Sequence, residues 1–162
     1  MNRQIISSIS DQLELILQGS PWIYDTYKIK FVYVTERNAF IRPLPTLHSV
    51  AEIVWHLTNW RTTIIDRACN GNPRKVEKEW SENEELKRIG WDKLLETFMH
   101  SCQVLKSILA SKNDDFLEEK YFDPDYNEEK NFQFLIEGLL HHDLYHMGQI
   151  GIIIKLLKEG KN

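Results

Sequence analysis

The sequence contains only two cysteines, Cys69 and Cys102, and their spacing resembles no metal-binding or redox motif. Because they lie far apart, the sequence argues against a disulfide, and neither thiol has neighbours that would support catalysis. We interpret each as a reduced, half-buried thiol. This use of cysteine is typical of a cytoplasmic protein.

Long apolar runs and an excess of positive charge are also missing. No stretch approaches the roughly 20 apolar residues of a membrane span, and the opening MNRQIISSISDQLELILQG is too polar for a signal peptide. The net charge of -4 and a pI near 5.9 argue against binding to nucleic acid phosphates. We therefore expect a cytoplasmic protein that binds neither nucleic acid nor membranes. The mixed charges of RKVEKEWSENEELKR are interpreted as a solvated surface.

What the chain does contain is enough apolar sequence for a core. Its 162 residues are 42% hydrophobic, show no internal repeats and include no Gly/Ser-rich linker. We expect residues 1–162 to form a single domain.

Four segments repeat apolar residues every three or four positions, which predicts long helices over about 3–18, 49–70, 84–111 and 132–158. Gly90 indicates that the third helix could begin later. Four long helices predict an all-α protein, a four-helix bundle with a short extra segment between the first two helices.

The second helix carries signals at both of its ends. Ser49 followed by Glu52 three residues later forms a capping box, which satisfies free backbone N–H groups at a helix start. Asn70-Gly71 followed by Pro73 predicts the end of the helix.

Two connecting segments are less regular. Within residues 22–45 we favour a short helix, because a lone strand would lack a partner. A strand at Ile29–Val34 stays the open alternative. The segment LEEKYFDPDYNEEKNF is interpreted as a loop.

Histidines stand where the fourth helix should be apolar. One face of this helix carries Leu135, Leu139, His142, His146, Ile150, Ile153 and Leu157. His142 and His146 are one turn apart, so their rings can converge, whereas His141 points about a quarter turn away. The second helix places His56 at the edge of its apolar stripe. If the two helices face each other, three imidazoles meet and suit a divalent transition metal, with zinc and nickel both plausible.

Several motifs together resemble the DinB/YfiT-like superfamily of metal-binding four-helix bundles. They are Gly19–Trp22, Arg42-Pro43 with Pro45, His48-Ser49, Glu52-Ile53-Val54 with His56 and Trp60, and His142-Asp143 with Tyr145-His146 and Gly148-Gln149-Ile150. The resemblance implies that His56, His142 and His146 bind nickel or zinc. It also implies a homodimer, and either a thiol transferase that uses a low-molecular-weight thiol such as bacillithiol or a metal-dependent hydrolase.

Other residues are candidates for the surroundings of the metal. Gln149 and Asn59 are polar side chains that could orient a ligating imidazole, and Trp22, Trp60 and Tyr145 could line a pocket for a small-molecule substrate. Gly148 in the middle of a helix suggests close approach by another segment.

Three functions remain open from the sequence. A thiol bound to a cation held by neutral histidines ionises readily and can attack an electrophile. Hydroxide generated from water at the metal could instead hydrolyse a substrate, although no spacing places Glu52 or Asp143 over the metal as a base. A bundle that only binds a metal or a ligand is the third. The missing base favours thiol transfer.

Overall fold

The computed structural model describes residues 2–70 and 75–160. Within these ranges the chain is mostly helical, as expected. The elements in chain order are α1 (Gln4–Gln18), α2 (Tyr27–Phe31), α3 (Val50–Asn70), α4 (Asn83–Ile89), α5 (Trp91–Ser111), α6 (Asp114–Glu118), β1 (Lys120–Asp123), β2 (Glu128–Asn131) and α7 (Phe132–Glu159).

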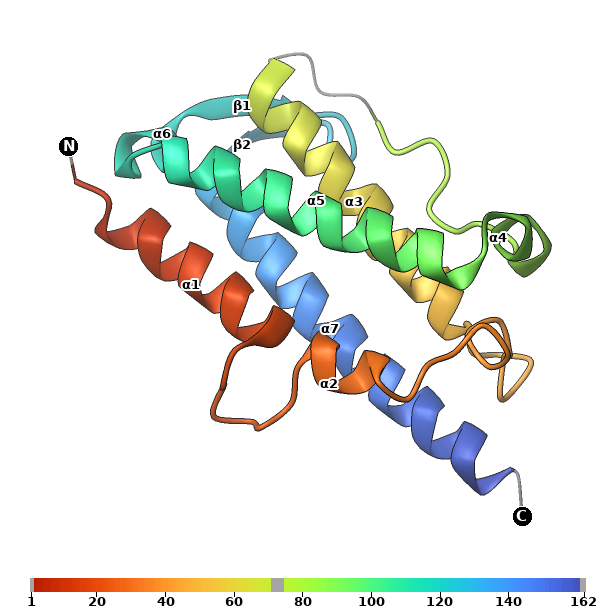
Figure 1. Ribbon diagram of the computed structural model, residues 1–162. Helices are drawn as coiled ribbons and strands as arrows, with labels where there is room; N and C mark the ends of the chain where they lie inside the picture. Colours follow the sequence, from red (N-terminus) through yellow and green to blue (C-terminus); the bar gives the residue numbers. More distant parts are fainter. Residues whose placement is uncertain (1, 71–74, 161–162) are drawn as a thin grey trace.

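The four longest helices pack against one another. Helix α3 contacts both α5 and α7, and α1 contacts the same two helices (Figure 1). These helices correspond to the four segments predicted from apolar spacing, while Gly71 and Pro73, the expected end signals after α3, lie outside the described residues. None of the described helices combines the length and apolar character that a membrane crossing needs.

The capping box at the start of α3 is formed as predicted. The Ser49 amide donates to Glu52 Oε2 at 2.7 Å, and the Glu52 amide donates to Ser49 Oγ at 3.2 Å. Arg42 Nε also donates to Glu52 Oε2 at 2.9 Å. The Glu52 carboxylate is therefore buried and fully engaged at the helix start.

Glycine and a capping threonine decide two details of the connections. Residues 27–31 form the short helix α2, whose start is capped by Thr26 Oγ1 accepting from the Ile29 amide at 3.2 Å, so the alternative strand is excluded. Gly90 has φ of 85°, a backbone conformation that favours glycine, and it separates α4 from α5. The third predicted helix therefore begins at Trp91.

The loop interpretation of residues 117–132 is wrong, because two short strands form here, while the described residues remain mostly helical, consistent with the all-α prediction. β1 and β2 pair antiparallel, with Lys120 opposite Asn131 and Asp123 opposite Glu128. The hairpin lies where α3 ends and α7 begins (Figure 1). Tyr121 and Asp123 both face inward along β1. The inward aspartate breaks the apolar alternation by which a strand is normally predicted.

A polar layer divides the core in two. One apolar cluster contains Leu57, Phe98 and Met147, and the other contains Ile64, Leu105 and Leu139. Between these positions on the three helices lie Arg61, Ser101 and Asp143, which are buried and joined by the Arg61–Asp143 ion pair. A charged pair buried together avoids the larger penalty of one buried alone. The pair joins α3 to α7.

Candidate metal centre

Three histidines converge at the edge of this polar layer. His56 comes from α3, and His142 and His146 come from α7 one turn apart. His56 Nε2 lies 2.9 Å from His142 Nε2, and one ring nitrogen from each of the three residues lies within 4.8 Å of the others. The convergence expected from helical spacing is therefore observed. These residues could hold a metal ion.

Two of the imidazoles are oriented by hydrogen bonds from their outer nitrogens. His56 Nδ1–H donates to the Glu79 backbone carbonyl at 2.8 Å, and His146 Nδ1–H donates to Gln149 Oε1 at 2.7 Å. Each bond fixes a tautomer whose Nε2 lone pair faces the other histidines. Gln149 therefore contacts one of the three imidazoles, and its role in orienting a metal ligand stays a prediction.

The histidines are held in the neutral form. Burial lowers the pKa of His142 to about 3, with further repulsion from His146 and His56. Burial also lowers the pKa of His146 to about 4, and it lowers that of His56. Neutral imidazoles offer lone pairs, which is the form in which histidine binds a metal. The donor set therefore fits a divalent transition metal.

These depressed pKa values predict a pH dependence of the metal-free protein. Unfolded histidines bind protons below about pH 6.5, whereas His142 and His146 in the folded chain stay neutral down to about pH 3 and 4. The folded state then binds fewer protons. We expect the free energy of unfolding to decrease as the pH falls from about 6.5 to about 4, by at most about 1.4 kcal/mol per pH unit for each histidine.

Urea denaturation at several pH values checks this expectation. Replacing both His142 and His146 with alanine should flatten the decrease, since the unfolded variant takes up two fewer protons. An equally steep decrease in the double variant would contradict the assignment.

Trp80, which was not among the residues predicted for the site, covers the histidines. Its ring stacks on His56 with 4.0 Å between ring centroids, and His48 stacks on the same indole at 3.6 Å. Trp80 belongs to the charged stretch interpreted as solvated surface, which is a correction to that interpretation. A single tryptophan amid charges was the available signal.

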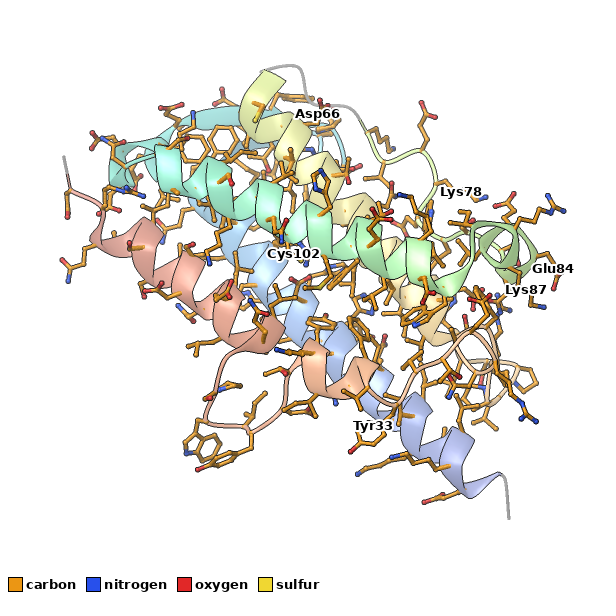
Figure 2. All side chains as sticks on the ribbon, viewed as in Figure 1. Tyr33, Asp66, Lys78, Glu84, Lys87 and Cys102 are labelled. Carbon is orange, nitrogen blue, oxygen red and sulfur yellow. The ribbon has the colours of Figure 1, made fainter. Side chains whose placement is uncertain are left out.

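The irregular segment of residues 75–82 is fastened over α3 by backbone contacts. Asn59 Nδ2 donates to the Lys78 carbonyl at 2.8 Å, and the Glu79 carbonyl accepts from His56. Figure 2 shows Lys78 on this segment, between the end of α3 and α4. Asn59 thus anchors the covering segment and makes no hydrogen bond to the histidines.

A pocket of about 340 Å³ opens beside His56 and His142. Trp60 lines it, with its ring 6.2 Å from that of His142. Tyr145 lies edge-on to His146 with 4.9 Å between centroids but is 63% exposed. Trp22 is 91% exposed and is not among the residues that line this pocket.

Acidic side chains at the centre are sparse. Asp143 pairs with Arg61 in the polar layer, and Glu52 is bound to Arg42 and Ser49. Glu79, by contrast, is exposed and lines the pocket with His56 and His142. It is the glutamate that the sequence analysis did not single out, because it lies 23 residues from His56 in the charged stretch.

Several remaining expectations concern residues outside the centre. His141 is exposed and apart from the cluster, as predicted. Gly148 makes no close approach, since a methyl group added there would meet no atom within 4 Å. Cys69 is exposed rather than half-buried. Cys102 is partly buried, and burial raises the pKa of its thiol to about 11.

The fold and the site together define a mostly helical protein with a three-histidine centre that could hold a metal ion. The chain matches the sequence model of the DinB superfamily over residues 31–150. This range covers most of the chain and contains all three histidines, so the protein belongs to the DinB superfamily, whose members are typically metal-binding. A comparison with curated proteins found no match.

Proposed function

We propose that His56, His142 and His146 bind a divalent transition metal, nickel or zinc, and that the protein is a thiol transferase. The single observation that carries this proposal is the convergence of three neutral imidazoles beside a pocket of about 340 Å³. Imidazole nitrogens suit both metals. Three protein ligands leave at least one position for a bound molecule.

The co-substrate in this proposal is a low-molecular-weight thiol. A cation held by three neutral imidazoles would keep its positive charge and would lower the pKa of a thiol bound to it. The thiol loses its proton to solvent, and the sulfur then forms a bond to an electrophilic carbon. The bond between that carbon and its leaving group breaks, and the leaving group takes the electron pair. Suitable electrophiles are halides, which release a halide ion, epoxides, whose C–O bond breaks to give an alkoxide, and activated alkenes, whose π bond breaks to give a carbanion. The alkoxide or the carbanion then takes a proton from solvent.

The protein's own residues supply position and exclusion of water. The Glu79 carbonyl and the Gln149 side chain hold two imidazoles, and the Trp60 and Trp80 rings flank the cluster. Neither described cysteine contributes a thiolate at the centre, because Cys102 has a raised pKa and Cys69 is exposed elsewhere. An external thiol is therefore needed for this chemistry.

Hydrolysis is the second candidate, and Glu79 is the observation that favours it. Glu79 is among the residues that line the pocket, and its negative charge acts on His56, so its carboxylate could accept a proton from water, as metal-assisted hydrolysis usually needs. A bundle that binds a metal or ligand without turnover would need no such base.

One assay separates these functions. Protein purified without a histidine tag is analysed for metal and then incubated with a panel of thiols and a generic electrophile, and separately with ester and amide substrates. Acceleration that requires both metal and thiol supports the transferase. Turnover of esters or amides without thiol would replace it with the hydrolase, and silence in both assays would favour binding alone.

Glu79→Gln sharpens this comparison. Under the transferase proposal, we expect this variant to change the rate of thiol transfer by less than about threefold, because a metal-bound thiolate needs no carboxylate base. General-base catalysis contributes about 10²–10⁴-fold, so a loss of that size would support hydrolysis. Glu77→Gln is the matched control, since Glu77 is exposed on the same segment and does not line the pocket.

We further propose that residues 1–162 form one four-helix-bundle domain that acts in the cytoplasm as a homodimer on a small-molecule substrate, without nucleic acid. Exposed apolar side chains along α7, namely Leu144, Tyr145 and Ile152, support self-association. The acidic net charge of -4 supports the absence of nucleic acid binding. Light scattering of the purified protein measures the oligomeric state.

A further inference from the structure

The pocket beside the histidines is a trough between two helices that ends at the hairpin. Helix α3 contributes His56, Trp60 and Ile64, which follow one another at spacings of four and share one face. Helix α7 contributes the facing residues, and Asp123, Asp125 and Tyr126 of the hairpin line the other end. Figure 1 shows this hairpin beside the end of α3. A molecule in the trough therefore has one end at the histidines and the other at the hairpin.

Apolar side chains form most of the trough's walls. They are Trp60, Ile64, Tyr126, Phe134, Leu135 and Leu139. Ile64, Leu135 and Leu139 belong to one of the two buried apolar clusters, so the floor of the trough is an uncovered edge of the core. A volume of about 340 Å³ is at the small end of ligand pockets and suits about one or two aromatic rings.

The charges in the trough disfavour an anion. Apart from the histidines, Arg67 is the basic residue among the described lining residues, and it is 2% exposed and paired with Asp123 and Asp125. Glu79 adds a carboxylate near the histidine end. Lys130 Nζ lies 4.6 Å from the centre of the Phe134 ring and 5.3 Å from that of Tyr126, but it is paired with Glu128 at 2.6 Å. Away from the metal at the histidine end, a ligand carboxylate would therefore meet cations that are already paired with carboxylates, and further negative groups beside them, which costs binding energy.

We propose that the trough binds the electrophilic substrate, and that this substrate is an apolar molecule of one or two aromatic rings without negative charge. This inference rests on the proposed thiol transfer at the same centre. A thiol that bears carboxylates does not match the walls of the trough. The electrophile therefore occupies the trough, with its reactive carbon at the histidine end.

Two probes of the same shape test the preference. 2-Naphthamide is uncharged and 2-naphthoate carries a carboxylate. Their affinities are measured by calorimetry on the full chain, as purified and after treatment with a chelator, because a carboxylate can bind the metal directly. In the chelator-treated protein we expect 2-naphthamide to bind at least about tenfold more tightly. Equal or tighter binding of 2-naphthoate there would overturn the inference.

Gly138 allows the trough to be blocked without touching a histidine. It lines the trough in α7, and a methyl group added there would meet no atom within 4 Å. Gly138→Leu should lower the affinity for 2-naphthamide at least about tenfold. Gly148→Leu is the matched control, because Gly148 lies in the same helix with equally open surroundings and away from the trough. It should change the affinity less than about twofold.

The outcomes separate this inference from the proposed function. Metal binding with an affinity for 2-naphthamide that Gly138→Leu leaves unchanged would overturn the trough assignment and leave thiol transfer standing. Absence of metal from every preparation, with the preference for 2-naphthamide intact, would refute thiol transfer and still support an apolar trough. Circular dichroism of both glycine variants establishes that they are folded; leucine in place of a helical glycine favours the helix.

Discussion

His142→Ala protein is expected to purify with at least about 100-fold weaker metal affinity than the wild type, as measured by elemental analysis and competition with a chelator. Loss of a residue that merely orients a ligand typically costs 10–100-fold. Loss of one of three ligands should exceed that, because His142 Nε2 faces the nitrogens of His56 and His146 directly. The wild type should carry about one metal ion per chain.

His141→Ala is the matched control for this experiment. His141 precedes His142 on the same helix but is exposed and outside the cluster. It should retain the metal content of the wild type. Equal metal content in the His142→Ala and wild-type proteins would contradict the proposed centre.

Asp143→Ala is expected to lower the free energy of unfolding by about 3–5 kcal/mol, because removing one partner of a buried ion pair leaves the other charge without compensation. The side chains of Arg61 and Asp143 are 2% and 3% exposed. Arg61 Nη1 keeps only a long bond to Ser101 Oγ, at 3.4 Å, and its guanidinium lies 4.8 Å from the centre of the Phe98 ring. Chemical denaturation of the metal-free protein measures the change.

Two further variants test the reason for this loss. Arg61→Met combined with Asp143→Leu should recover most of the stability, since apolar replacement of a whole buried pair is often neutral or stabilising. Glu96→Ala, which breaks the exposed Lys93–Glu96 pair on α5, should leave the free energy of unfolding nearly unchanged, because solvent screens such a pair. A loss in Asp143→Ala no larger than in Glu96→Ala would show that the buried pair does not stabilise the contact of α3 with α7.

Local signals predicted much of the helical structure. Apolar spacing predicted α1, α3, α5 and α7, and the hydrogen bonds between Ser49 and Glu52 formed as the motif requires. These features depend on residues three or four apart, whose relation in a helix is set by its geometry. Gly90 predicted its break for the same local reason, since its φ of 85° favours glycine.

Long-range contacts were predicted poorly. The hairpin was missed because Asp123 faces inward, where its carboxylate forms an ion pair with Arg67 of α3. Trp80 and Glu79 were missed because their relation to His56 arises only when residues 75–82 fold across α3. The prediction of a close approach at Gly148 was wrong, because position within a helix does not show whether another segment packs against it.

By itself, the sequence determined which side chains share a helix face, and therefore that His142 and His146 point to one place and that His141 does not. Helical geometry repeats every 3.6 residues, so this follows from spacing alone. Only the tertiary structure decided that His56 meets them, that Trp80 covers them, and that an apolar trough opens beside them, with Arg67 and Lys130 paired to carboxylates. Those relations join residues far apart in the chain, and they exist only because packing of the apolar clusters and the Arg61–Asp143 pair brings α3 and α7 together.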